Sequence, residues 1–60
     1  MSIEKELKEY DVVEDVLQQA DIYGLRAEVM ATAIAIIRDN PKLPTGSAYT
    51  MAAYDWDIGY

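Results

Sequence analysis

Cysteine and histidine are both absent from this sequence of 60 residues. The lack of cysteine excludes disulfides, thiolate nucleophiles and zinc–thiolate centres. The lack of histidine removes the commonest general base and the commonest side-chain ligand of transition metals. A domain this short buries only about 60% of the surface that its unfolded chain exposes. Disulfides, a structural metal or oligomerisation usually compensate, and of these three the composition supports only oligomerisation well.

Basic residues are also scarce. Five Lys and Arg stand against eleven Asp and Glu, which gives a formal net charge of −6 at pH 7. Seven acids and two lysines fall within residues 1–21, a balance of −5, so most of the negative charge lies there. Such a surface repels phosphate backbones and anionic lipids, so we expect no direct nucleic-acid binding and no membrane binding. The acidic, polar start of the chain lacks the features of a signal peptide, and we expect a cytoplasmic protein.

The chain is rich in apolar residues with helical spacing. Hydrophobic residues make up 52% of the sequence, and strand-like alternation is absent. The pattern predicts one all-α domain, residues 1–60, with three helices over about 3–23, 25–38 and 46–57. Gly24 suits the end of the first helix, and Asn40-Pro41 suits the end of the second. The apolar face of the first helix shifts near Asp11, where a break is possible, but a continuous helix is favoured.

The middle helix is apolar on nearly every side. Its segment from Val29 to Ile37 carries no charge, and its apolar arc is about twice the 100° that a surface helix needs. Two flanking helices cover only part of such a surface, so we expect the middle helix to be central and the protein to be a homo-oligomer. The residues expected at the self-association surface are Ala27, Met30, Ala31, Ile34, Ala35 and Ile37. For the alanines, the alternative is that they are simply good helix formers on a half-exposed face.

Aromatic residues gather near the end of the chain. Four of the six lie between Tyr49 and Tyr60. Tyr49 and Trp56 share a helix face with Ala48 and Ala52, which favours a place in the core for both aromatic rings. The other side of this helix and the end of the chain form a candidate surface for a protein partner, comprising Met51, Tyr54, Ile58 and Tyr60.

Carboxylates are the only candidate acid–base groups. A paired-carboxylate site needs one desolvated carboxyl group, whereas the acids here lie on charge-rich helix faces or near the end of the chain. We therefore predict no enzyme, no catalytic or metal-binding residue and no cofactor. A different use of the acids is to imitate the phosphates of a nucleic acid. The candidate acidic mimic face comprises Glu4, Asp11, Glu14, Asp15 and Asp21, and its alternative is a solvated face that keeps the protein soluble.

Two segments of the sequence, AEVMATAIAIIRDNPKL and, a short distance later, AAYDW, form a recognisable pair. Together they resemble a group of short, largely uncharacterised bacteriophage proteins. Those proteins join an apolar helix that ends in Asn-Pro-x-Leu to a last helix that ends in an acidic residue and Trp. The matching positions are Glu28, Val29, Ala33, Asn40, Pro41, Leu43, Ala48, Asp55 and Trp56. The family opens its last helix with a Ser/Thr cap and acidic residues, where this chain has Pro44-Thr45-Gly46-Ser47.

The resemblance implies a phage origin and a small helical fold, and it carries over no catalytic residue. With the composition and the apolar middle helix, it predicts a small non-enzymatic protein–protein interaction protein. In this hypothesis the protein is a bacteriophage accessory factor that self-associates and binds a host or phage protein. The first alternative is an acidic inhibitor that mimics nucleic acid and blocks a DNA- or RNA-binding protein. The second is a metal binder or enzyme built on carboxylates.

Overall fold

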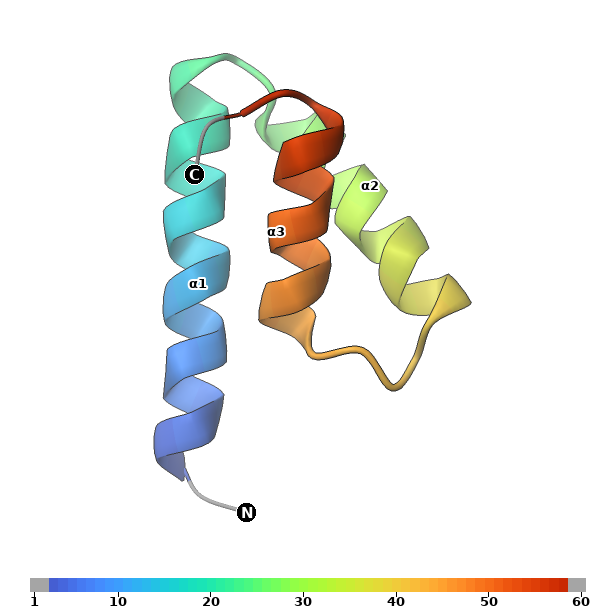
Figure 1. The fold of residues 1–60 in the computed structure, drawn as a ribbon. Coiled ribbons are helices and arrows are strands. Elements are labelled where there is room, and N and C mark those ends of the chain that lie inside the picture. Colours follow the sequence, from blue (N-terminus) through green and yellow to red (C-terminus); the bar gives the residue numbers. More distant parts are fainter. Residues whose placement is uncertain (1–2, 59–60) are drawn as a thin grey trace.

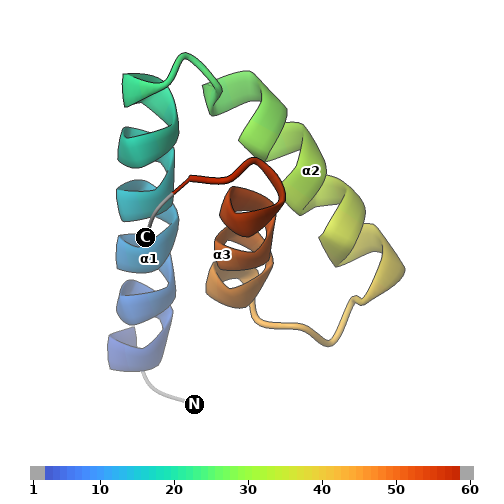
Figure 2. The same cartoon turned by 45° about the horizontal axis from the view of Figure 1, so that its top comes forward.

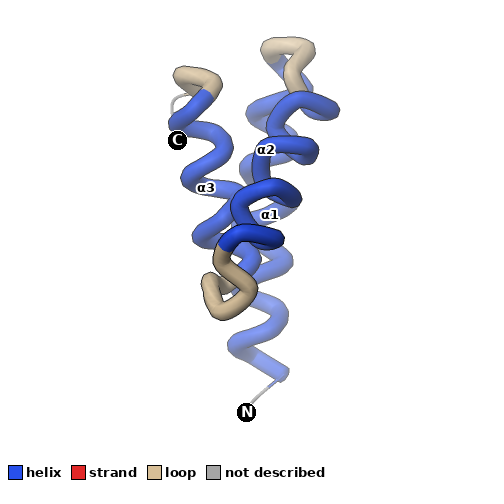
Figure 3. The backbone as a smooth tube through the Cα atoms, turned by 90° about the vertical axis from the view of Figure 1, so that its right-hand side faces the viewer, coloured by secondary structure: helices blue, strands red, loops and turns tan. Residues whose placement is uncertain are grey.

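The described part of the chain folds into three α-helices, as the spacing of its apolar residues predicts. The computed structural model describes residues 3–58, with side chains from residue 10 onward. The helices are α1 (Ile3–Ile22), α2 (Arg26–Asp39) and α3 (Thr45–Asp55). They run up, down and up, so that the α1–α2 connection and the end of α3 lie at one end of the molecule, opposite the α2–α3 loop (Figure 3). The all-α class and the three helices are confirmed, and so is the continuity of α1 through Asp11.

Gly24 ends the first helix through its backbone conformation. Its φ of 69° lies in the left-handed region, which an L side chain rarely adopts. The amide of Leu25 donates to the carbonyl of Ala20 (2.8 Å), and the amide of Gly24 donates to the carbonyl of Asp21 (3.0 Å). This pair of bonds is a Schellman motif, which satisfies the last carbonyls of a helix while reversing the chain. The turn sends the chain directly into α2.

The third helix, not the middle one, is central. Both views of the ribbon place α3 between α1 and α2 (Figures 1 and 2), and α3 contacts each of them more extensively than they contact each other. The expectation that the middle helix is central is therefore wrong. The physical reason is side-chain size, because helices approach most closely where the contact residues are small. The buried residues of α3 include Gly46, Ala48, Ala52 and Ala53.

The core is built mainly from small side chains. Its members are Val16 and Ala20 from α1, Val29 and Ala33 from α2, and Tyr49, Ala52, Ala53 and Ile58 from α3 and the turn after it. The predicted burial of Tyr49 is confirmed, whereas Trp56 is 40% exposed and does not belong to the core. The indole N–H of Trp56 instead donates to the hydroxyl of Thr32 (2.9 Å). This bond joins the end of α3 to α2.

A second Schellman motif ends α3. Ile58 N–H donates to the carbonyl of Ala53 (3.0 Å), and Asp57 N–H donates to that of Tyr54 (3.0 Å). Asp57 takes the left-handed conformation, with a φ of 56°. The motif turns the chain back toward the bundle, and Ile58 enters the core with only 2% of its surface exposed.

Asp57 is accordingly the residue where a glycine should stabilise the fold. Asp57→Gly relieves the steric cost of the left-handed conformation and removes an acid from the negative end of the helix dipole. We expect a gain of about 1 kcal/mol in the free energy of unfolding, or about 5 °C in Tm for a domain of this size. Thermal unfolding followed by circular dichroism measures it. Asp57→Ala is the control, because it removes the charge but keeps the Cβ, and an equal gain from it would contradict the conformational explanation.

Candidate functional site

The side of α2 that faces away from α3 presents a continuous apolar strip. Val29 and Ala33 point into the core, and the opposite side of the helix is exposed. Met30 is 36% exposed and Ile34 is 47% exposed, both large fractions for side chains of this size. We call this strip the α2 outer face; its apolar residues are Ala27, Met30, Ala31, Ile34 and Ala35, and all five are exposed.

These five residues belong to the set of six that the sequence predicts for self-association. The sixth, Ile37, is partly buried and packs against the core, so the structure separates it from the others. The exposure of the alanines follows from the position of α3, which contacts α2 on one side only. None of the described residues covers the α2 outer face, and its use in self-association stays a prediction.

Two charged residues border the α2 outer face at its two ends. Glu28 lies in the first turn of α2 and Arg38 lies in the last turn. An acid at the N-terminal end and a base at the C-terminal end each interact favourably with the helix dipole. Both side chains are exposed. The strip is therefore bordered by the acid Glu28 near its start and by the base Arg38, which the exposed Asp39 follows, near its end.

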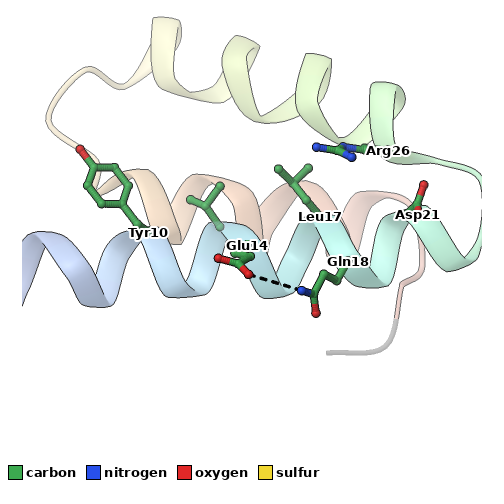
Figure 4. Close-up of a pocket in the computed structure, with 7 residues that line it drawn as sticks. Tyr10, Glu14, Leu17, Gln18, Asp21 and Arg26 are labelled. Carbon is green, nitrogen blue, oxygen red and sulfur yellow. Dashed lines mark hydrogen bonds between the residues drawn. The ribbon is translucent and has the colours of Figure 1, made fainter.

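A groove runs between α1 and the start of α2. It has a volume of about 390 Å³ and is lined by Tyr10, Val13, Glu14, Leu17, Gln18 and Asp21 of α1 together with Arg26 of α2. Tyr10 lies at one end of the groove, and Asp21 and Arg26 lie at the other (Figure 4). The amide of Gln18 donates to a carboxylate oxygen of Glu14 (3.4 Å), one helical turn away. The groove thus combines an apolar base with a charged, solvent-exposed rim.

The acidic mimic face of α1 is solvent-exposed where its side chains are described. Asp11, Glu14, Asp15 and Asp21 are all exposed and lie on one side of the helix, and two of them, Glu14 and Asp21, also line the groove. Glu4 belongs to the same predicted face, but its side chain lies outside the described residues. The structure therefore brings together four of the five predicted acids. Their use as a phosphate mimic stays a prediction.

The predicted partner surface on α3 is only partly formed. Met51 is 47% exposed and Tyr54 is 63% exposed, as a binding surface requires. Ile58 was expected at this surface, and that prediction is wrong, because the Schellman motif after α3 directs its side chain into the core. Tyr60 lies outside the described residues.

Other exposed apolar side chains were not predicted from the sequence. Ile22 is 73% exposed and Tyr23 is 60% exposed, both at the turn between α1 and α2. On a helical wheel Ile22 lies well away from Val16 and Ala20, and this offset is the signal that could have identified it. Tyr10 and Arg26, which line the groove, gave no comparable signal because the groove forms only when α2 folds back along α1.

Two further kinds of site can be assessed over the described residues. Among the side chains described, no three acidic groups are arranged to hold a metal ion. No helix in the same part of the chain combines the length and the hydropathy needed to cross a membrane.

Over residues 3–58, the fold and these surfaces define an all-α, three-helix domain with an exposed apolar face on α2. No protein-family model, no curated protein and no solved structure matches the chain. The resemblance to short bacteriophage proteins is not tested by these comparisons and stays a prediction.

Proposed function

We propose that this chain is a small non-enzymatic protein–protein interaction protein that self-associates through the α2 outer face. The observation that carries the proposal is the exposure of Met30 and Ile34 beside three exposed alanines on one side of one helix. Burying the exposed part of each large side chain would contribute about 1 kcal/mol, since full burial of Met or Ile is worth about 1.5–3 kcal/mol. A symmetric pair gains this contribution from both copies. Small side chains between the large ones permit close approach of two helices.

The role extends to a second protein, of the host or of a phage, in keeping with the sequence resemblance. Met51 and Tyr54 are the exposed apolar residues of α3 that support such a contact. They lie on a different helix from the α2 outer face, so the two contacts use separate residues. We place this function in the cytoplasm of the host cell.

The proposal is tested by absolute mass in solution. Light scattering over a dilution series should give twice the chain mass of 6.8 kDa at high concentration. Ile34→Glu introduces a charge that would be buried in the interface, and it should weaken the dimer by at least about a hundredfold. Met51→Glu is the matched control, because Met51 and Ile34 are both 47% exposed, and this variant should remain dimeric. A monomer at every concentration of the unmodified protein would overturn the proposal.

Mimicry of nucleic acid is the second candidate, supported by the four exposed carboxylates on one side of α1. Light scattering on a variant of the acidic mimic face distinguishes this surface from the α2 outer face. A triple variant, Asp11→Asn, Glu14→Gln and Asp15→Asn, should leave self-association unchanged because none of the three residues lies on the α2 outer face. Binding of a basic protein through the acidic face would instead be lost in this variant and would weaken steeply with salt.

A further inference from the structure

We infer that the occupant of the α2 outer face is a second copy of this chain, bound with its α2 antiparallel and with Arg38 beside the partner's Glu28. This inference rests on the proposed self-association and adds its geometry. The structure contributes the exposure of the face, the order of residues along it and the charges at its two ends.

The centre of the α2 outer face is a straight row of residues. At about 100° per residue, Ala27, Ala31, Ile34 and Arg38 fall within about 60° of one another around the helix. Met30 lies on one flank of this row. Glu28 and Ala35 lie on the other flank. The row begins with a small residue and ends with a long cation, and this asymmetry makes the direction of a partner helix matter.

An antiparallel two-fold pair matches large residues with small ones along the row. If the symmetry axis passes between Thr32 and Ala33, Ile34 is level with the partner's Ala31, and Ala27 is level with the partner's Arg38. A two-fold interface is isologous, so each match occurs twice. Ile34 then fills the space that the partner's alanine leaves and contacts the partner's Met30 on the same flank. Such matching allows the close interaxial distance that small residues permit.

The charges also select the antiparallel direction. In this register each Arg38 lies beside the Glu28 of the other copy, which gives two ion pairs across the interface. In a parallel pair each Arg38 would face the same arginine of the other copy at the C-terminal end of the interface, where like charges repel. Antiparallel packing also brings opposite ends of the two helix dipoles together.

The position of Arg38 also favours a second copy over an unrelated apolar partner. Arg38 lies in the same row as Ile34, so a partner that covers this face also desolvates the guanidinium. A purely apolar partner would leave that charge unpaired, which is costly. A second copy supplies its Glu28 at the required place.

Charge reversal tests this arrangement. Glu28→Arg and Arg38→Glu should each weaken the dimer by about tenfold, because each variant places two like-charged pairs in the interface. The double variant Glu28→Arg/Arg38→Glu should return the dissociation constant to within about threefold of the original value, since both ion pairs are restored with reversed sign. Analytical ultracentrifugation over a dilution series measures all three constants. Circular dichroism on each variant verifies that the helix content is kept.

Net charge does not explain this pattern. Glu28→Arg changes the formal net charge from −6 to −4, and Arg38→Glu changes it from −6 to −8. General repulsion between the two copies would therefore lower the dissociation constant of the first variant and raise that of the second. Arg26→Glu is the matched control: it also gives −8, on the same helix, but lies about 120° around from Arg38. Its dissociation constant should stay within about threefold of the original.

The failure of this inference is distinguishable from the failure of the proposed function. A dimer that Ile34→Glu dissociates, but that both charge reversals leave intact, overturns the antiparallel register and keeps self-association through α2. A double variant that is weaker than either single variant also overturns the register. A monomer at every concentration overturns both proposals.

Discussion

Replacing Ile58 by alanine is expected to remove about 3 kcal/mol from the free energy of unfolding. The side chain is 2% exposed and belongs to the core cluster, although it lies after the last helix. Truncation of a buried Ile to Ala costs about 2–5 kcal/mol, because the transfer free energy is lost and the cavity closes only partly. A domain of this length has a total stability of about 3–9 kcal/mol. The variant should therefore lose between about a third and all of the stability of the fold.

Urea unfolding followed by circular dichroism measures this loss, and Met51→Ala is the control. Met51 carries a side chain of similar size but is 47% exposed, so its truncation should cost less than about 1 kcal/mol. The comparison isolates burial from hydrophobicity, since both wild-type residues are large and apolar. Equal losses from the two variants would contradict the placement of Ile58 in the core. The result matters for function because it decides whether Ile58 is available to a partner.

The second large loss of stability is expected when a buried side chain is made larger rather than smaller. Ala52→Leu should destabilise the fold by about 3 kcal/mol, since Ala52 is fully buried on the central helix and added methylenes in a packed core cost about 1–3 kcal/mol. The bundle depends on small side chains along α3, where both other helices pack. A leucine at this position forces either an off-rotamer side chain or a wider separation of the helices.

Ala35→Leu is the matched control for Ala52→Leu. The substitution is chemically identical, but Ala35 is exposed on the α2 outer face. Its effect on the unfolding of the monomer should lie within about 0.5 kcal/mol. Urea titrations at concentrations below the dimer dissociation constant make the comparison, so that association does not contribute. Similar destabilisation by the two leucines would mean that Ala35 is packed as tightly as Ala52 and would contradict the exposure of the α2 outer face.

The helices and most of their ends follow from local chemistry that the sequence displays directly. Gly24 ends α1 because only a residue without a Cβ takes its conformation without strain, and Pro41 cannot extend α2. The turn at Asp57 was missed because aspartate in the left-handed conformation has no clear sequence signal. The error propagated to Ile58, whose position was extrapolated from the helical wheel of α3.

The exposure of the four described acids on α1 (Asp11, Glu14, Asp15 and Asp21) also follows from sequence, because a carboxylate without an ionic partner stays in water wherever the helix is placed. The alanines are different. Ala27, Ala31 and Ala35 on α2 have the same four-residue spacing as Ala48 and Ala52 on α3, yet the first set is exposed and the second is buried.

The sequence by itself determined the class of the fold, the three helices and the exposed charges, since these depend on interactions within a few residues and with water. Only the tertiary structure decided which alanine strip is buried, which helix is central and where Ile58 lies. A strip of small residues fits equally well against a neighbouring helix or against solvent. The choice depends on the packing of all three helices at once, which no local pattern encodes.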